Sequence, residues 1–264
     1  MVAEMTTVQW VMLGGGGALA VFGVVAVILG ARARGKLKAV TGTSTVSVAQ
    51  AASAAGTVAG AQVELKGTAE GQPPLTSPAT NTPCLYFKHK VEGLRVRMER
   101  DDDGTMRQHQ DWDVVYEEER STPFVLRDSS GAVWVMPDGA EFVSERSLKN
   151  AQGAMGYSIP QQSVGERVLD TVATVLTSEY DYYTRYRTSE WVIPVGRPLY
   201  VLGSVVRDGE QARVAAGGGK FIISCKSEEE LSRKYRLSSW LWTVFGILSL
   251  GGGAALAAVG ALKK

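Results

Sequence analysis

Residues 84–98 read CLYFKHKVEGLRVRM, a stretch in which apolar and β-branched side chains recur with charged ones between them. A period of two is typical of a β-strand whose two faces meet different surroundings. We interpret the stretch as one strand or two. On this alternation Cys84, Tyr86 and Lys88 lie on one face, and Phe87 and His89 lie on the other.

Stretches of the same kind lie on both sides of it and are broken by turn residues, which predicts a β-rich region. A hairpin is expected at 124–136 with its tip at Asp128 to Gly131, while 207–219 is expected to be a loop. An amphipathic helix is expected at 163–176, where apolar residues recur at helical spacing. The other predicted strands are 63–70, 112–120, 182–194, 198–206 and 220–225. With eight or nine short strands, we expect a small barrel or sandwich.

The two ends of the chain are apolar. Residues 10–31 (WVMLGGGGALAVFGVVAVILGA) and 240–262 (WLWTVFGILSLGGGAALAAVGAL) contain no charged side chain. Twenty-two helical residues extend for about 33 Å, which matches a bilayer core. The fold class predicted is therefore an α+β membrane protein, in which two transmembrane helices flank a β-rich domain with one amphipathic helix.

Basic residues lie on the inner sides of both spans. Arg32, Arg34, Lys36 and Lys38 follow the first, and Lys226, Arg233, Lys234 and Arg236 precede the second, against only Lys263 and Lys264 outside. This bias predicts a multi-pass cell-membrane protein with two spans and a cytoplasmic central domain.

Five segments follow from these patterns. We expect a tail at 1–9, a span at 10–31, a linker with a short helix near Val46–Ala55 at 32–61, the β-rich domain at 62–236 and a span at 240–262. Glycines within the spans let helix backbones approach closely, so Gly15, Gly23, Gly246 and Gly252 are candidate packing residues in a hairpin or a homo-oligomer. Simple tolerance of glycine in lipid explains them equally well.

The sequence offers little reactive chemistry. Cys84 and His89 differ in strand parity, so they pair only through a bulge. With Cys225 and His109 they show no zinc spacing, and Asp101 to Asp103 are best read as a solvated turn. Lys and Arg together number 28 against 27 Asp and Glu, which argues against a nucleic-acid partner. We expect no catalytic residue, no cofactor and no metal.

Several short motifs occur in a fixed order: VELKGTAE (63–70), PLTSP (74–78), TPCLYFKHKVE (82–92), TPFVLRDSSGAVWVMPDGAEF (122–142) and EWVIPVGRPLYVLGSVV (190–206). Together they resemble the GIDE domain, also called the BAM ("beside a membrane") domain, of mitochondrial-anchored E3 ubiquitin ligases and their prokaryotic relatives. The resemblance covers residues 62–224.

The resemblance implies a domain placed between two transmembrane helices, with ubiquitin transfer carried out by a RING finger after the second. This chain ends at Lys264 and has two Cys and two His, so it does not supply the eight ligands of a RING finger. In the ligases the domain faces the intermembrane space, which differs from the orientation predicted by charge. The positions carried over are Gly67, Pro83, Cys84, Tyr86, Trp112, Phe124, Asp128, Gly131, Pro137, Glu190, Gly196, Tyr200 and Gly203. Most of them have structural interpretations, and Cys84, Tyr86, Asp128 and Glu190 are the candidate binding residues.

Three functional hypotheses remain. The first is a membrane-anchored, non-catalytic module that binds a protein or small ligand, in prokaryotic stress or defence signalling as the resemblance implies. The second is an E3 ubiquitin ligase-like protein without its catalytic finger, or a thiol enzyme that uses Cys84. The third is an oligomeric membrane scaffold.

Overall fold

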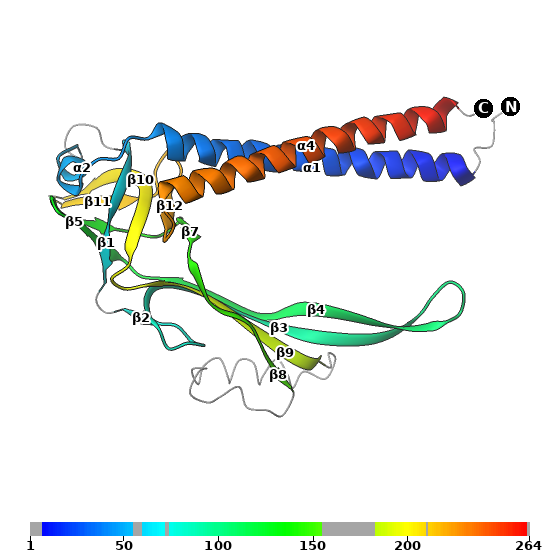
Figure 1. The fold of residues 1–264 in the computed structure, drawn as a ribbon, viewed down its shortest axis with the longest axis horizontal. Helices are drawn as coiled ribbons and strands as arrows, with labels where there is room; N and C mark the ends of the chain where they lie inside the picture. Colours follow the sequence, from blue (N-terminus) through cyan, green and yellow to red (C-terminus); the bar gives the residue numbers. More distant parts are fainter. Residues whose placement is uncertain (1–6, 55–59, 72–73, 155–182, 210, 263–264) are drawn as a thin grey trace. The chain divides into compact units, whose positions relative to one another are not determined.

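The computed structural model describes residues 7–54, 60–71, 74–154, 183–209 and 211–262. They form two compact units (Figure 1). The helical unit, residues 1–44 and 227–264, contains α1 (Thr7–Gly42) and α4 (Glu228–Leu262). The β-rich unit, residues 45–226, contains the short helix α2 (Val48–Ala54) and the strands. The helix expected at 163–176 lies outside the described residues.

Glycines spaced by seven residues form the contact between α1 and α4. On α1 these glycines are Gly16, Gly23 and Gly30. On α4 they are Gly246, Gly253 and Gly260, and Gly260 is buried. A Cβ added at Gly16 would lie 2.8 Å from the carbonyl oxygen of Gly253, and one at Gly253 would lie 2.7 Å from that of Gly16. A seven-residue repeat keeps one face of each helix toward the other, so the two backbones touch along their length.

Two of the predicted packing glycines lie at this contact. Gly23 lies against Leu250, and Gly246 lies against Val27. Gly15 and Gly252 have no atom within 4 Å of an added Cβ. Because neighbouring helical residues point about 100° apart, the contact passes through the residue after each of these two glycines.

Both helices are longer than the uncharged runs. α1 continues to Gly42 through residues that were expected to begin a linker, because 32–40 are mostly Ala, Arg, Lys and Leu, which favour helix. α4 begins at Glu228 after Ser227, whose hydroxyl accepts the Glu230 N–H at 3.4 Å. Ser227 with Glu230 three residues later is a capping-box pattern, and the acidic first turn suits the positive end of the helix dipole.

Seven strands form the first sheet: β1 (Gln62–Glu70), β5 (Phe124–Asp128), β6 (Gly131–Val135), β7 (Glu141–Val143), β10 (Pro198–Asp208), β11 (Gln211–Ala215) and β12 (Ile222–Ser224). The pairings β1–β5, β5–β6, β6–β11, β11–β10 and β10–β1 close a ring of five strands. β12 follows β11 along the same edge of β10 and pairs with β7. The ring is a small barrel.

The second sheet is antiparallel, in the order β4-β3-β9-β8. Its strands are β3 (Pro83–Arg100), β4 (Met106–Ser121), β8 (Glu145–Ala154) and β9 (Tyr183–Pro194), with β2 (Leu75–Thr76) beside the start of β3. β3 is one continuous strand through Gly93, where an added Cβ would lie 2.6 Å from the ring of Tyr183. A side chain at position 93 would therefore displace that ring.

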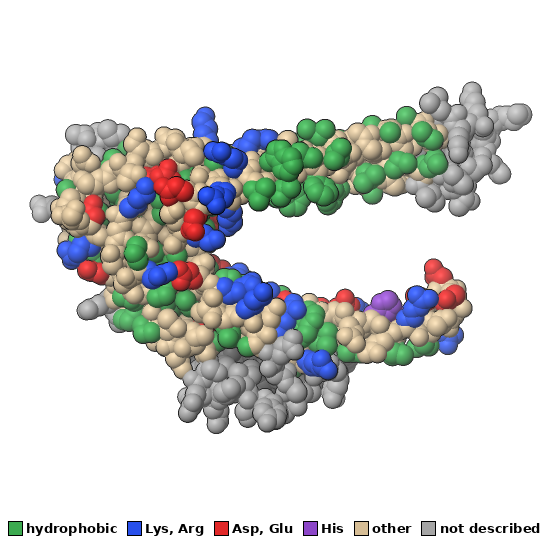
Figure 2. All heavy atoms as spheres, viewed as in Figure 1, with side chains coloured by type: hydrophobic (Ala, Val, Ile, Leu, Met, Phe, Trp, Pro, Cys, Tyr) green, Lys and Arg blue, Asp and Glu red, His purple; other side chains and the backbone are tan. Residues whose placement is uncertain are grey.

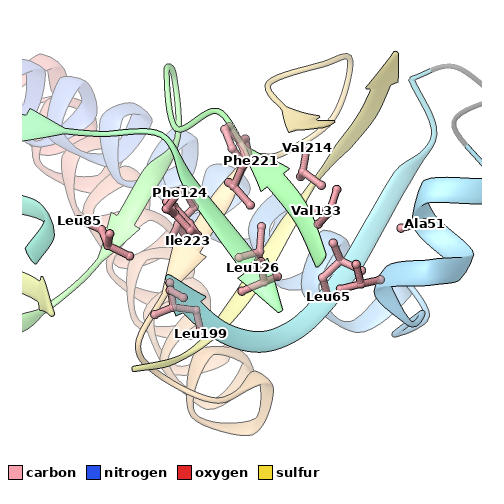
Figure 3. Packing of buried hydrophobic residues seen from close by; sticks show 14 of the residues in the cluster. Ala51, Leu65, Leu85, Phe124, Leu126, Val133, Leu199, Val214, Phe221 and Ile223 are labelled. Carbon is pink, nitrogen blue, oxygen red and sulfur yellow. The ribbon is translucent and has the colours of Figure 1, made fainter. Parts of the chain in front are cut away.

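A single hydrophobic cluster fills the barrel (Figure 3). Leu65, Phe124, Leu126, Val201 and Val214 are each at most 1% exposed. Leu85, Tyr86 and Ile193 from the second sheet belong to the same cluster, so the two sheets share a core.

The α+β class is confirmed, with a β-barrel core and two helices long and apolar enough to cross a membrane. β2, β7, β8 and β11 were not predicted. β8 reads ERSLKNAQGA and lies at a sheet edge, so its sequence lacks apolar alternation. β11 falls in the segment expected to be a loop.

We expect Gly16→Leu or Gly253→Leu to lower the free energy of unfolding by about 1–3 kcal/mol, because the side chain would meet a backbone carbonyl across the contact. Unfolding of the full chain in detergent or lipid measures this. Gly15→Leu and Gly252→Leu are the matched controls and should change stability little. Equal effects at all four positions would contradict the contact.

Candidate functional site

A fully buried carboxylate, that of Glu190 on β9, lies in the centre of the second sheet. Its Oε1 accepts hydrogen bonds from the hydroxyls of Ser77 at 3.0 Å, Ser147 at 2.9 Å and Thr80. Its Oε2 accepts the backbone N–H of Ala79 at 2.7 Å. Burial raises the pKa of this carboxyl, but the neighbouring His89 imidazole and the hydrogen bonds from Thr80, Ala79 and Ser147 outweigh burial and lower the pKa to about 2. Glu190 thus attaches the loop before β3 to the sheet, and it also links β9 to β8.

His89 faces this carboxylate from β3. It is fully buried, and its Nδ1 lies 3.8 Å from Glu190 Oε2, too far for a hydrogen bond. Among the described residues neither ring nitrogen has a hydrogen-bond partner, and the ring meets the edge of Tyr116 at 6.0 Å between centroids. The contact is an ion pair only when the imidazole is protonated.

A β-bulge changes the predicted faces of β3. Cys84 pairs with Pro194 and Tyr86 with Ile193, so Leu85 is an extra residue on β3. Cys84 consequently packs with Phe87, on the face that was assigned to Phe87 and His89. The parity argument that separated Cys84 from His89 is therefore wrong at this point of the strand.

The surroundings of the Cys84 thiol disfavour its thiolate form. It is fully buried, and burial, followed by the negative charge of Glu190, raises its pKa to about 12. Phe87 lies between it and His89 along the face, which places the two groups on the order of 10 Å apart. Cys225 is half-buried, and burial raises its pKa to about 11. Both thiols are free.

The other two predicted binding residues also have structural roles. The Tyr86 ring stacks on Phe142 at 3.9 Å between centroids, and its hydroxyl donates to Glu119 Oε1 at 2.9 Å. Asp128 accepts the N–H of Val48, the first residue of α2, at 2.9 Å, and it also accepts both donors of Ser130. These hydrogen bonds, chiefly that of Ser130, lower the pKa of Asp128. Asp128 caps α2 from the β5–β6 turn.

A second buried carboxylate, Glu64 in the barrel, was not predicted. It accepts hydrogen bonds from the hydroxyls of Tyr200, at 3.0 Å, and Thr45, and Lys66 Nζ lies 3.2 Å away. Thr45 also forms a β-bridge with Glu64. The network fixes the start of the β-rich unit against β1. The alternation in VELKG placed Glu64 on a polar face and gave no sign of its burial.

The hairpin β3–β4 forms an arm whose two faces differ. One face carries ion pairs, with Arg95 Nη2 2.7 Å from Asp113 Oδ2 and Arg97 Nη2 3.4 Å from Asp111 Oδ2. Arg107 continues the row beside the turn, with Nε 2.9 Å from Asp101 Oδ2. These charges are paired within the arm, which suits a face in contact with water.

The opposite face of the arm carries its apolar side chains. Alternation from Leu94, which is opposite Trp112, places Leu94, Val96, Met98, Met106, Trp112 and Val114 on it, together with Arg100, Gln108 and Gln110. Met98 is 60% exposed, Met106 50% and Val114 54%. At the base of this face the Arg187 guanidinium lies over the Trp112 ring at 4.4 Å and binds both carboxylate oxygens of Glu92.

The end of the arm has only two strands. Pairing of β3 with β9 ends at Arg95, so within the described chain 96–100 pair only with 106–110. We call residues 96–110 the distal arm. A two-stranded ribbon with one apolar face is marginally stable in water alone.

In the described part of the chain, no group of three or more His, Cys, Asp or Glu side chains is arranged to hold a metal. The conspicuous polar groups take part in packing. Among the described residues of the β-rich unit, three of the four exposed large apolar side chains, Met98, Met106 and Val114, lie on the arm, and the fourth, Trp134, lies on β6. Methionines 98 and 106 were visible in the sequence, but their exposure depends on where β9 stops.

A family model, GIDE, described as E3 ubiquitin ligase, matches residues 94–258, more than half of the chain. It extends from β3 into α4 and confirms the resemblance seen in the motifs. No curated protein and no solved structure matches the chain.

We expect Glu190→Gln to destabilise the fold by about 2–3 kcal/mol at neutral pH. The NH2 group of the new amide would face hydroxyl and N–H donors that now bind the carboxylate, so these donors would lose an acceptor. The folded-state pKa is about 2, below an unfolded value of about 4.3. The carboxylate's contribution is therefore present above about pH 4.3 and is lost as the pH falls toward 2.

Urea unfolding of wild type and Glu190→Gln from pH 7 to pH 2.5 measures this, with the exposed Glu99→Gln as the matched control. The difference between wild type and Glu190→Gln should narrow below about pH 4.3. A difference of the same size at pH 3 and pH 7 would refute the role of the charged form.

Asp128→Ala should lower the free energy of unfolding by about 1 kcal/mol, since the N-terminus of α2 and the β5–β6 turn lose a shared acceptor. The measurement is equilibrium unfolding, and Asp102→Ala in the exposed turn of the arm serves as the control. Stability unchanged by Asp128→Ala would rule out the capping role.

Proposed function

Because the chain belongs to the GIDE family, whose description is E3 ubiquitin ligase, we propose that it is a membrane-anchored, non-catalytic docking protein. Its helix pair spans a membrane, and its β-rich unit binds a protein partner through the apolar face of the distal arm. The single observation that carries this proposal is that face, which is exposed on a two-stranded ribbon.

The surface of the helix pair supports the anchor. In the most apolar window of each helix only 22% and 17% of the residues are buried, so neither helix is the core of a soluble unit. Val21, Phe22, Phe245, Ile247 and Leu248 are each about half exposed or more. Figure 2 shows hydrophobic side chains along this helix pair. An apolar surface of this length is stable in a hydrocarbon environment. Following the charge bias, we place the β-rich unit in the cytoplasm.

The chemistry of the distal arm favours a protein partner over the lipid surface. Glu99, Asp101, Asp102 and Asp103 lie at its tip against three arginines. Acidic side chains are repelled by anionic membranes. Methionine is flexible and polarizable, so it adapts to an apolar protein surface, and the glutamines opposite Met98 and Val96 offer hydrogen bonds beside it.

Ubiquitin transfer by these 264 residues is not part of the proposal. Two Cys and two His do not provide the eight ligands of two zinc ions. Of the two thiols, Cys84 is buried and Cys225 has a raised pKa. Within a ligase family, a domain of this kind would position a partner.

Photo-crosslinking on the full chain in native membranes tests the docking face. A photoreactive amino acid placed at Met98 or Met106 should give the same discrete protein adduct, whereas one at Glu99 or His109 on the charged face should not. Met98→Glu combined with Met106→Glu should abolish the adduct formed by a photoreactive residue at position 96, and Glu99→Gln combined with His109→Gln should leave it intact.

Three results would overturn the docking role. They are adducts to lipid only, adducts only within the same chain, and equal adducts from both faces of the arm. Release of the unmodified chain from membranes by alkaline wash would instead overturn the anchor.

A further inference from the structure

Seven basic side chains gather at one end of the helix pair. They are Arg32, Arg34, Lys36 and Lys38 of α1 and Arg233, Lys234 and Arg236 of α4, and we call them the basic belt. All except Lys36 are exposed. Figure 2 shows Lys and Arg side chains next to the hydrophobic ones on this unit.

Contacts between the helices place the two halves of the belt beside each other, with the α1 half extending further toward the apolar region. Gly30 lies against Thr243, Arg34 Nη1 donates to Thr243 Oγ1 at 2.7 Å, and the Lys36 ammonium lies 5.7 Å from the Tyr235 ring. Lys234 Nζ lies 5.8 Å from the same ring. At 1.5 Å per residue the belt occupies a band about 10–12 Å deep. The polar headgroup layer on one side of a bilayer is about 5–8 Å deep, so a band of this depth extends through the layer.

The charge of the belt is not balanced by the helices. Residues 7–42 and 231–262 contain no Asp or Glu. The acidic side chains of α4 are Glu228, Glu229 and Glu230 in its first turn, on the side of the belt away from the apolar region. Seven basic groups against these three leave a clear positive excess.

The belt borders an apolar surface with interfacial residues. Trp240 and Trp242, 61% and 37% exposed, follow the belt along α4 by one to two turns. Tryptophan prefers the boundary between headgroups and hydrocarbon. Arg34 uses one donor on Thr243, and a guanidinium has five, so it can also bind a phosphate oxygen.

We propose that the basic belt selects anionic phospholipid headgroups, so that a shell of anionic lipid surrounds this end of the helix pair. Fixing orientation during insertion requires only a bias in the number of basic residues. Seven basic groups in one band around an antiparallel helix pair additionally produce a local positive electrostatic potential, which attracts phosphate groups. This inference rests on the membrane anchor proposed above, and it is independent of the docking arm.

Electron spin resonance of spin-labelled lipids tests this on the full chain in phosphatidylcholine vesicles that contain one-fifth phosphatidylglycerol. Labelled phosphatidylglycerol should associate with the protein more strongly than labelled phosphatidylcholine, by about threefold or more at low salt. The preference should shrink near 1 M salt, where the Debye length falls to about 3 Å.

Two matched variants separate charge from packing. Arg32→Gln, Arg34→Gln, Arg233→Gln and Arg236→Gln together should remove most of the preference, whereas the four corresponding Arg→Lys changes should retain most of it. Circular dichroism checks that both variants keep their helices.

Equal association of the two lipids with wild type, or a preference that survives the four Gln changes, would refute lipid selection by the basic belt. Neither result would bear on the membrane anchor. A chain that an alkaline wash removes from the vesicles would overturn both.

Discussion

The pairing of β1 with β10 is the constraint on which the β-rich unit depends. Seven residue pairs, from Gln62–Ser204 to Thr68–Pro198, close the five-stranded ring around one hydrophobic core. They also bring together the two ends of the unit. Thr45 bridges Glu64 on β1, Glu64 lies opposite Leu202 on β10, and Leu202 lies opposite Ile222 on β12. At about 4.8 Å per strand, Thr45 and Ile222, near the start and end of the unit, are about 15 Å apart.

Much of this architecture could be predicted from sequence, where local patterns report the environment. The uncharged runs predicted the two long helices, and alternation predicted the strands that face the core. Sequence patterns failed to predict features that depend on contacts between segments far apart in the chain. The polar edge strand β8 has no buried face to mark it, and the bulge at Leu85 arises from the pairing with β9. The glycine contact was visible as a seven-residue spacing, but single glycines were chosen from within runs of them.

The four residues chosen from the sequence as candidate binding residues each have a place in the packing of the fold. Glu190 attaches a loop, Asp128 caps a helix, Tyr86 fills the core, and Cys84 is a buried thiol. For Glu190 and Tyr86 the physical reason is that buried polar groups must be satisfied, so the fold supplies their hydrogen-bond partners. Surfaces remain available for function. The distal arm offers an apolar face, and the helix pair offers an apolar length with a basic end, which together support a tethered docking protein.

Cysteine labelling in intact cells tests most directly whether the chain crosses the membrane twice, with its β-rich unit on the opposite side from its termini. The native thiols should react slowly, since burial raises the pKa of both Cys84 and Cys225. An impermeant maleimide should label a cysteine placed at Ala3 from outside, and it should label one placed at Asp102 only after permeabilisation. Labelling of both positions from the same side would contradict the two-span account.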